Sequence, residues 1–420
     1  MKYGLIGEKL GHSFSKEIHS EIGMYDYELK EIPREKIKEF FEEKDFLGIN
    51  VTIPYKEEVI PYLDWISVDA KKIGAVNTIV NRNGKLYGYN TDYYGAKNLI
   101  IKAGVEINNK KVLILGTGGT SKTLFSVVKD LGAREIIKVS RSGKDNCVKY
   151  DEAIKFHGDA EVIVNTTPSG MYPNGDSVPI DINAFVKTEG VIDVIYNPLN
   201  TRLVLQAKEK NIKASGGLYM LVGQAVKAAE HFMNAEIDKE RITNDIYEKI
   251  ISRKRNVVLI GMPGSGKSTV GKIIAEKTGK TFIDTDELIE RETGLSPGQI
   301  ITVYGEQYFR NIEKETVKKA AQGNGAVIAT GGGIVKDGDN ISELKKNGVI
   351  CFIDRDIGLL AMTPDRPLSS DTVKLKKIFD ERYDKYLSGA DFTVKSDSTA
   401  EDVADRIIGL LKNVEKERGV

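Results

Sequence analysis

The stretch GMPGSGKS, residues Gly261–Ser268, constrains this chain more than any other. It follows the apolar run NVVLIG, which indicates a buried strand, and it precedes a helical pattern that we predict to end near Gly279. A strand, a G-x-x-x-x-G-K-S loop and a helix in this order are typical of a loop that binds nucleotide phosphates. Backbone N–H groups of such a loop face phosphate oxygens, Lys267 offsets their charge, and Ser268 offers a hydroxyl to Mg²⁺.

A second glycine-rich turn, GTGGTS at Gly116–Ser121, has a different design, because it lacks the lysine. It lies between the strand-like run KVLILG and a helical pattern, and the strand-like run EIIKVSRS follows, so the segment predicts a βαβ unit that binds a dinucleotide. The second strand ends with Arg141 and Lys144 rather than an acid, which favours NADPH over NADH. The alternative is a surface loop whose charges are only solvated.

Strand-like and helical runs alternate through almost all of the 420 residues, which predicts an α/β fold with parallel sheets in two or three domains. The stretch ERITNDIYEKIISRK predicts a helix that ends near Lys254. We place the main domain boundary at Ser252–Arg253, where no stretch rich in glycine, serine or proline predicts a long tether.

Composition excludes several classes of function. Lys plus Arg and Asp plus Glu both number 61, and no basic stripe is evident, which argues against a nucleic-acid partner. No apolar run reaches roughly 18 residues and no signal peptide is evident, so we expect no membrane span. The two cysteines are far apart and the four histidines do not cluster, so we expect a reduced, cytoplasmic location and no imidazole metal site.

Four features after the phosphate loop narrow its function. The run TFIDTD predicts an extended strand with Asp284 and Asp286 on one side, so one carboxylate can serve a metal while the other faces an acceptor hydroxyl. Arg310 and Glu313 are three residues apart, on one predicted helix face, where Glu can orient Arg. The stretches TGGG, DRPL and ERYDKY follow in that order. Taken singly, each charged residue is more often a solvated surface group.

Together these motifs, from about Asn256 to the C-terminus, resemble shikimate kinase. The resemblance implies a P-loop nucleotide kinase-like parallel-sheet domain that uses ATP and Mg²⁺ to phosphorylate the 3-hydroxyl of shikimate. It implies that Lys267, Asp286 and Arg366 are catalytic, and that Ser268 and Asp284 hold the metal. It assigns the nucleotide to Gly264, Ser265, Gly266, Lys267, Ser268, Thr269 and Arg366, and shikimate to Asp286, Arg310, Gly331, Gly332, Gly333 and Arg382.

The first hundred residues offer short polar side chains at the ends of strand-like runs, in the stretches GHSFS, NVTIPYK, GAVNT and GYNTD. Such residues suit a small polyhydroxylated ligand. Lys56 and Asp92 suit proton exchange at a carbonyl or an alcohol while a hydride moves to or from nicotinamide. The alternative for this pair is an ordinary surface ion pair.

These stretches, with NTTPSGM, DVIYNPLNT and GGLYMLVGQA, resemble shikimate dehydrogenase over about Met1–Ile250. The resemblance implies reversible, NADPH-dependent reduction of 3-dehydroshikimate to shikimate, with Lys56 and Asp92 as the catalytic pair. It assigns the substrate to Ser13, Ser15, Thr52, Lys56, Asn77, Asp92, Gln224 and Tyr196, and NADP to Gly116, Gly118, Gly119, Thr120, Ser140, Arg141, Ser142 and Gly216. Where the family often has N-R-T, this chain has Ser140-Arg141-Ser142.

We therefore expect a two-lobed dehydrogenase with a Rossmann-type NADP-binding domain in residues 1–252, followed by the kinase-like domain in residues 253–420. Residues 1–100 and 219–252 would form the substrate lobe, and residues 101–218 the NADP-binding lobe. The partners would be small molecules, and the sequence does not indicate an oligomeric state. Two alternatives stay open. The first keeps both enzymes but changes their substrates, to quinate or another cyclic polyol in the first half and to another small metabolite in the kinase half. The second is a nucleotide- and metabolite-sensing regulator without turnover.

Overall fold

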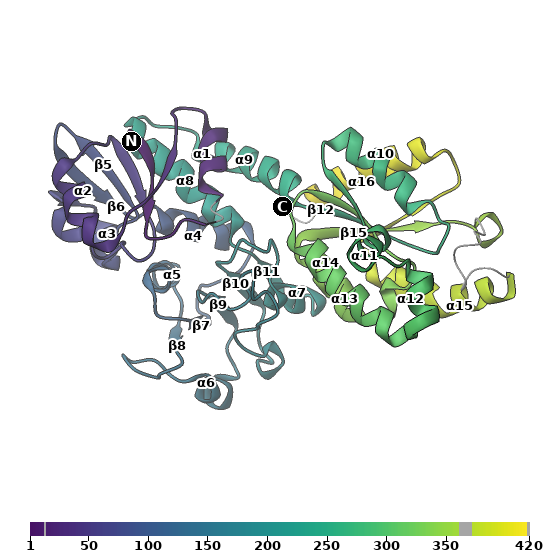
Figure 1. The fold of residues 1–420 in the computed structure, drawn as a ribbon. Helices are drawn as coiled ribbons and strands as arrows, with labels where there is room; N and C mark the ends of the chain where they lie inside the picture. Colours follow the sequence, from purple (N-terminus) through teal and green to yellow (C-terminus); the bar gives the residue numbers. More distant parts are fainter. Residues whose placement is uncertain (12–13, 361–371, 418–420) are drawn as a thin grey trace. The chain divides into compact units, whose positions relative to one another are not determined.

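The computed structural model describes residues 1–11, 14–360 and 372–417, with side chains omitted at 372–374 and 413–417. Contacts divide the chain into two compact units, Met1–Ile250 and Ile251–Val420, and helix α9 (Lys239–Lys254) contains the boundary between them. Figure 1 shows the elements of each unit. Both units are α/β, as expected from the alternating pattern.

The first unit contains two sheets. The first has the order β2-β1-β3-β5-β6-β4. Its strands are β1 (Tyr3–Gly7), β2 (Glu28–Glu31), β3 (Gly48–Val51), β4 (Trp65–Ile66), β5 (Thr78–Arg82) and β6 (Lys85–Tyr89). The associated helices are α1 (Ser15–Ile22), η1 (Arg34–Lys36), α2 (Ile37–Glu43), η2 (Ile60–Tyr62), α3 (Val68–Ile73), α4 (Thr91–Lys102), α8 (Leu218–Met233) and α9.

The prediction of parallel sheets is wrong for part of this first sheet. Strand β5 is antiparallel to both β3 and β6. Asn83 and Gly84, between β5 and β6, both have positive φ angles, 53° and 84°. An Asn-Gly pair adopts this backbone at low cost and makes a tight hairpin turn. This local turn signal therefore overrides the general α/β pattern.

The second sheet has the order β11-β10-β9-β7-β8, and all of its pairs are parallel. Its strands are β7 (Lys111–Leu115), β8 (Glu135–Val139), β9 (Val162–Asn165), β10 (Gly190–Asp193) and β11 (Lys213–Ser215), with helices α5 (Gly119–Asp130), α6 (Tyr150–His157), η3 (Ile182–Ala184) and α7 (Arg202–Glu209). The predicted β7-α5-β8 unit is confirmed. Helix α8 then returns to pack against α4 and α1. A Cβ at Gly95 would lie only 2.4 Å from the carbonyl oxygen of Met220, so glycine permits the close α4–α8 approach.

The second unit has one parallel sheet of order β13-β14-β12-β15-β16. Its strands are β12 (Asn256–Ile260), β13 (Thr281–Asp284), β14 (Ala326–Ala329), β15 (Gly348–Asp354) and β16 (Phe392–Lys395). Its helices are α10 (Lys267–Thr278), α11 (Thr285–Thr293), α12 (Pro297–Tyr304), α13 (Glu306–Gln322), η4 (Ile334–Lys336), α14 (Gly338–Asn347), η5 (Ile357–Leu359), α15 (Thr372–Gly389) and α16 (Ala400–Glu417).

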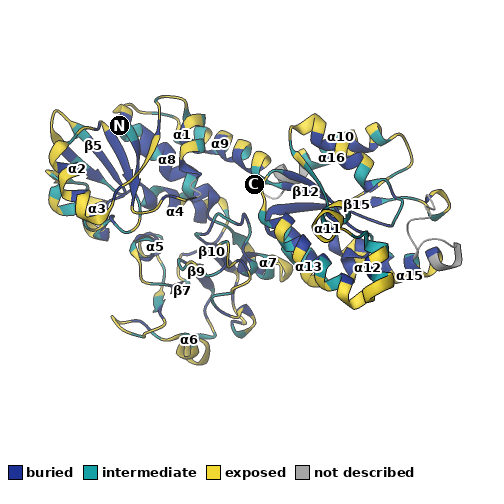
Figure 2. Cartoon of the chain, in the orientation of Figure 1, coloured by how far each residue is buried: buried dark blue, intermediate teal, exposed yellow. Residues whose placement is uncertain are grey.

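Helices cover both faces of this sheet. Val257 and Leu259 of β12 pack in one apolar cluster with residues of α10 and α16, while Val258 and Ile260 pack in another with residues of α13, α14 and α15. Because side chains alternate along a strand, a strand buried on both faces is a continuous apolar run, as NVVLI is. Figure 2 shows the strands of this unit in dark blue between helices whose outer faces are yellow. Across the described residues, no helix combines the length and apolar character that crossing a membrane requires.

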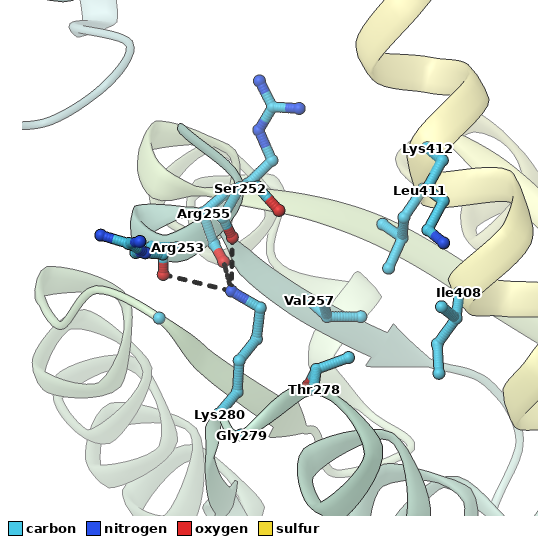
Figure 3. A pocket seen from close by; sticks show the side chains of 11 residues that line it. Ser252, Arg253, Arg255, Val257, Thr278, Gly279, Lys280, Ile408, Leu411 and Lys412 are labelled. Atoms are coloured by element: carbon cyan, nitrogen blue, oxygen red, sulfur yellow. Dashed lines mark hydrogen bonds between the residues drawn. The ribbon is translucent and has the colours of Figure 1, made fainter. Parts of the chain in front are cut away.

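A cavity of about 300 Å³ lies at the start of β12, at the opposite end of that strand from the phosphate loop. Figure 3 shows Lys280 among its lining residues, directed at the carbonyl oxygens at the end of α9. The Lys280 Nζ donates to the carbonyl oxygens of Ser252, Arg253 and Arg255 at 2.7, 3.2 and 2.9 Å. The last carbonyls of a helix lack intrahelical partners, and a cation there stabilises them. Lys280, which lines this cavity, therefore stabilises the end of α9.

Candidate functional site

Lys56 and Asp92 form an ion pair in the first unit, with the Nζ 2.6 Å from the Oδ2. Their side chains are 16% and 10% exposed, so the pair is largely shielded from water while one side stays accessible. Lys56 follows β3, and its carbonyl oxygen accepts from the backbone N–H of Val76 at 2.7 Å. Among the described residues, the side chains of Lys56 and Asp92 hydrogen-bond only to each other. A ligand can thus approach the pair without displacing another protein group.

The backbone of helix α4 aims Asp92 at the site. Asn90 caps the helix by accepting from the N–H of Tyr93 at 3.1 Å, which places Asp92 in the first turn. The N–H of the intervening Thr91 donates to the Oδ1 of Asn77 at 2.7 Å, so the Asn77 amide is oriented with its Nδ2 as the group that can donate to a ligand. Thr91 Oγ1 also donates to the Oε1 of Gln224 at 3.5 Å. Thr91 therefore contacts Asn77 and Gln224 and directly precedes Asp92, and the resemblance assigns all three of these residues to the substrate.

The other substrate candidates make contacts of their own within the first unit. Ser15 is buried as the first residue of α1, beside Phe14, whose ring centroid lies 5.3 Å from that of Tyr196. Burial raises the pKa of the Tyr196 hydroxyl above its ordinary value. The backbone N–H of Thr52 donates to the carbonyl oxygen of Ile6 at 3.0 Å, which ties the end of β3 to β1. Ser13 lies outside the described residues.

The glycine-rich turn after β7 has the geometry that a dinucleotide needs. Gly116 has a φ of +105°, and its carbonyl oxygen accepts from the Oγ of Ser121 at 2.7 Å. A Cβ at Gly118, the N-cap of α5, would meet no atom within 4 Å, so the backbone there is open to a ligand. A Cβ at Gly119 would lie 3.9 Å from the Cδ of Lys56. The turn therefore brings a cofactor pyrophosphate and the Lys56–Asp92 pair to neighbouring positions.

The loop after β8 carries the predicted contacts to the ribose phosphate. The Oγ of the buried Ser140 accepts from the N–H of Gly143 at 3.1 Å, which holds the loop in a turn. Arg141 is exposed, and no ion pair in the described part of the chain engages it. Ser142 is also exposed, and Thr120 lies in the first turn of α5. Gly216 follows β11, where a Cβ would lie 2.5 Å from the carbonyl oxygen of Leu199. These groups fit a 2′-phosphate at Arg141.

In the second unit, the phosphate loop opens on a cavity of about 370 Å³ lined by Gly264, Gly266, Lys267, Ser268, Thr269, Asp284, Asp286, Thr330, Gly332 and Arg355. The strand–loop–helix context is confirmed by β12 and α10. Gly264 and Gly266 have φ angles of 80° and 93°, which a residue with a side chain rarely adopts. Lys267 Nζ donates to the carbonyl oxygens of Gly261 and Met262, both at 2.9 Å.

The prediction that Asp284 and Asp286 share one side of a strand is wrong. Strand β13 ends at Asp284, which is the N-cap of α11 and accepts from the N–H of Asp286 at 3.0 Å. Aspartate competes well for this capping position, and it ends the strand two residues earlier than expected. Both carboxylates still line the cavity. Ser268 Oγ donates to the Oδ2 of Asp284 at 2.6 Å, so a hydroxyl and a carboxylate oxygen, the ligands Mg²⁺ prefers, lie together.

The Gly331–Gly333 turn follows β14, and Gly332 lines the cavity. We call this side of the cavity its acceptor end, because the family resemblance assigns these glycines to the acceptor. A Cβ at Gly331 would lie 2.7 Å from the Oδ1 of Asp286, and a Cβ at Gly333 would overlap the Arg310 guanidinium. Arg382 Nη1 donates to the carbonyl oxygen of Gly332 at 2.8 Å. The absence of side chains thus lets one acid and two arginines converge on bare backbone.

The predicted Arg310–Glu313 pairing on one helix face is confirmed by an Nη1–Oε2 distance of 2.6 Å. Burial raises the pKa of Glu313, and the Arg310 guanidinium opposes that shift. Burial lowers the pKa of Arg310, but Glu313 and Glu306 outweigh it and raise the pKa above its ordinary value. The carboxylates of Glu306 and Glu313 therefore hold the Arg310 guanidinium in place, where its side chain is 15% exposed.

Three residues to which the sequence analysis assigned no role also contribute to this site, and one predicted residue of the second unit cannot be placed. Arg366 lies outside the described residues. Thr285 accepts from the N–H of Gly331 at 3.1 Å, and the Tyr386 hydroxyl donates to the carbonyl oxygen of Gly332. Arg355, directly after β15, lines the cavity. Thr285 lies within the TFIDTD stretch and Tyr386 within ERYDKY, so adjacency to a motif was the available signal, whereas no motif contains Arg355.

Comparison with known proteins agrees with both halves. The family model described as Shikimate dehydrogenase substrate binding domain matches residues 5–79, and the one described as Shikimate kinase matches residues 263–412. The chain is 42% identical over 261 residues to shikimate dehydrogenase (NADP(+)) of Clostridium beijerinckii, across 58% of this chain and 96% of that protein.

Solved structures give the same result for the first unit. A chorismate mutase/shikimate 5-dehydrogenase fusion protein from Clostridium acetobutylicum has a TM-score of 0.55 and 41% identity, covering 59% of this chain and 96% of that one. Shikimate 5-dehydrogenase from Thermus thermophilus, in complex with NADP(H) and shikimate, has a TM-score of 0.53 and 26% identity over 59% of this chain and 99% of that one. The chain belongs to the shikimate dehydrogenase family and carries, after that region, a shikimate kinase domain.

Proposed function

We propose that the chain catalyses two consecutive reactions: NADPH-dependent, reversible reduction of 3-dehydroshikimate to shikimate, and ATP-dependent phosphorylation of the 3-hydroxyl of shikimate. The observation that carries the proposal is the 2.6 Å Lys56–Asp92 ion pair beside Gly119 of the cofactor turn. The first activity would occupy residues 1–252 and the second residues 253–420. The independent set of groups around the phosphate loop supports the second activity.

In the reduction, Lys56 donates a proton to the substrate carbonyl oxygen. NADPH, when bound, supplies the hydride that reaches the carbonyl carbon. Asp92 holds the ammonium group in position through the ion pair. After the transfer, the neutral amine of Lys56 regains a proton from solvent on the accessible side of the pair, and in the oxidation direction the neutral amine accepts the proton of the substrate hydroxyl.

Binding groups would surround this pair on the substrate side. Asn77 would donate its Nδ2 to a hydroxyl, since its Oδ1 is engaged by Thr91. We assign the remaining hydroxyl and carboxylate contacts to Ser13, Ser15, Thr52, Gln224 and Tyr196. On the cofactor side, the pyrophosphate of NADP would be held by Gly116, Gly118, Gly119 and Thr120. The rest of the NADP molecule would be held by Ser140, Arg141, Ser142 and Gly216. Arg141 would select the 2′-phosphate by charge.

In the phosphoryl transfer, Lys267 and the N–H groups of residues 264–269 would bind the nucleotide phosphates. Ser268 and Asp284 would hold Mg²⁺ through oxygen atoms, with the remaining ligands from phosphate and water. Within the described ranges no cluster of three metal-binding side chains exists, which is consistent with a metal held mainly by its nucleotide. Asp286 would accept the proton of the attacking hydroxyl, while Arg310, Arg382 and Gly331–Gly333 bind the acceptor. Arg366 would stabilise charge on the transferring group.

Two substitutions test the proposal. Lys56→Ala should lower kcat/KM for 3-dehydroshikimate roughly 10²- to 10⁴-fold, as expected for loss of a positioned acid, and leave phosphorylation of shikimate unchanged. Lys267→Ala should lower phosphorylation by roughly a hundredfold or more through loss of transition-state charge stabilisation, and leave NADPH oxidation unchanged. Loss of both activities from either change in a folded protein would contradict independent sites.

Two further comparisons address the open alternatives. Relative kcat/KM values for shikimate and quinate, with NADP and with NAD, test whether another cyclic polyol is preferred. Retained binding of NADPH and ATP without turnover in the unaltered chain would instead support a sensing role.

A further inference from the structure

Arg355 emerges beside the phosphate loop because of how β15 and β12 pair. The two strands are parallel, with Ile260 opposite Phe352, so both end at the same edge of the sheet. The loop begins in close contact there, since a Cβ at Gly261 would lie 2.7 Å from the carbonyl oxygen of Ile353. Two residues later, Arg355 lines the same cavity as Lys267, and its Nη1 lies 3.9 Å from where a Cβ of Gly266 would be.

Within the part of the chain that the structure describes, the guanidinium of Arg355 has no partner. Its Nε is buried without a hydrogen bond, and among the described residues the side chain forms neither a hydrogen bond nor an ion pair. Its two acidic neighbours are engaged elsewhere. Asp354 Oδ2 accepts from the Tyr383 hydroxyl at 3.3 Å, and Asp356 caps η5 by accepting from the N–H of Gly358 at 2.8 Å. A charged group partly withdrawn from water without a partner is costly, which points to a ligand that supplies one.

The position of Arg355 separates it from the acceptor end of the cavity. Arg310 and Arg382, which we assign to the acceptor, contact the Gly331–Gly333 turn. Arg355 is instead next to Gly266, inside the loop whose N–H groups face phosphates. The ionisable groups that line the cavity are Lys267 and Arg355 on the basic side and Asp284 and Asp286 on the acidic side. Without Arg355, Lys267 would be the one cationic side chain among these lining residues, so Arg355 adds attraction for a triphosphate beyond that of Lys267 and the proposed Mg²⁺.

We propose that Arg355 binds the phosphate groups of the nucleoside triphosphate, from the end of β15. This inference rests on the proposed kinase function of the second unit. Arginine suits the role because its planar fork can donate two parallel hydrogen bonds to one phosphate. Because Arg355 directly follows β15, its backbone is fixed beside the loop, and its side chain supplies a second cation to the cavity that Lys267 lines.

The test uses the full chain and four proteins: the unaltered chain, Arg355→Met, Arg355→Lys and Arg291→Met. Met removes the charge and keeps an unbranched side chain. Arg291 is exposed in the last turn of α11, so its substitution controls for loss of one positive charge from the same unit. Calorimetry gives the dissociation constants of MgATP and MgADP, and phosphorylation kinetics give the separate KM values for ATP and shikimate. Reduction of 3-dehydroshikimate reports that the first unit is intact.

We expect Arg355→Met to weaken MgATP binding roughly 10- to 100-fold, the loss of a charge-assisted hydrogen bond pair, while KM for shikimate stays within about twofold. Arg355→Lys should fall between, because an ammonium keeps the charge but not the fork. Arg291→Met should match the unaltered chain. A larger effect on MgATP than on MgADP would place the contact at the terminal phosphate, and equal effects would place it at the inner phosphates.

Two other outcomes would overturn the inference. One is unchanged affinity for both nucleotides in Arg355→Met with full activity. The other is a raised KM for shikimate with unchanged nucleotide affinity, which would move Arg355 to the acceptor end. Failure of the proposed kinase function gives a different result, since the unaltered chain itself would then neither bind MgATP nor phosphorylate shikimate.

Discussion

The buried His19 of α1 makes the stability of the first unit depend on pH in a way that can be measured alone. Its side chain is 1% exposed, and its ring stacks on that of Tyr27 with centroids 3.7 Å apart. Its Nδ1 is 2.8 Å from the Tyr25 hydroxyl. Tyr27 in turn donates to the Oδ1 of Asn50, whose Nδ2 donates to Thr78 Oγ1 at 3.0 Å. His19 is therefore connected, through Tyr27, Asn50 and Thr78, to the hydroxyl of Thr91, which lies 3.0 Å from that of Thr78.

Burial lowers the pKa of His19 from 6.5 to about 3, and the Asn50 side chain partly opposes this. The unfolded chain takes up a proton at this residue below about pH 6.5, whereas the folded chain does not until about pH 3. The associated stability is therefore complete above the unfolded pKa and is lost progressively as the pH falls. At about pH 5 the difference is about 1.5 pKa units, or about 2 kcal/mol of the free energy of unfolding.

The measurement can use the single tryptophan of the chain. Trp65 lies in β4 of the first unit and is 45% exposed, so its fluorescence during urea denaturation reports this unit only. Between about pH 7.5 and about pH 5, the unaltered chain should lose about 2 kcal/mol more than His19→Phe, which keeps the stacked ring but cannot titrate. Tyr25→Phe is the matched control, because it removes the same hydrogen bond and retains the histidine.

Burial also lowers the pKa of His231, to about 4. Its contribution to the pH dependence of stability is the same in all three proteins, so it cancels from the comparison. Equal losses in the unaltered chain and in His19→Phe would refute the reasoning, because the burial of His19 would then carry no titration penalty. A Tyr25→Phe protein that behaved like His19→Phe would show instead that the hydrogen bond, not the charge, sets the slope.

Three other perturbations have defined outcomes. Burial raises the pKa of Asp193 to about 6 against hydrogen bonds from Thr201, Ile195 and Asn165, so its stabilising term is complete below the unfolded pKa and lost as the pH rises through about 6. Between about pH 5 and pH 8, the free energy of unfolding followed by Trp65 fluorescence should fall by roughly 1–2 kcal/mol in the unaltered chain relative to Asp193→Asn, in which the histidine contributions are the same and cancel. Glu313→Gln should raise KM for shikimate about tenfold in the phosphorylation assay, since Arg310 loses a charged partner, with KM for ATP unchanged. Arg141→Met should raise KM for NADPH about tenfold and leave KM for NADH unchanged, so the ratio of the two in 3-dehydroshikimate reduction is the readout.

The parts of the fold that sequence predicts best are those where local and global requirements agree. The glycines at 116, 264 and 266 occupy positive-φ positions, and each lies between an apolar run and a helical pattern. Positive φ is a backbone property that glycine alone adopts freely, so these turns can be recognised without knowing what surrounds them. The mixed character of the first sheet was also encoded locally, in Asn83–Gly84, but the general βα alternation concealed it.

The parts that sequence predicts poorly depend on residues brought together across the fold. Lys56 and Asp92 are 36 residues apart, and although their chemistry and the family resemblance both suggested a pair, no spacing rule predicts the 2.6 Å contact between them. Thr91 orients Asn77 and Gln224 through its backbone and hydroxyl, a role for which no spacing rule exists. Arg355 belongs to no motif, and its relevance depends on the pairing of β15 with β12.

Asp284 and Asp286 show how two predicted residues can line one cavity although the local structure predicted for them is wrong. On a strand, residues two apart share a side, whereas on a helix they differ by about 200° around the axis. Because α11 begins at Thr285, Asp284 turns back as the cap toward Ser268, while Asp286 lies near Gly331 and the acceptor groups. The start of the helix, rather than alternation along a strand, separates the acid beside Ser268 from the acid beside Gly331. The two carboxylates therefore have different neighbours, although an extended strand would have placed them on one side.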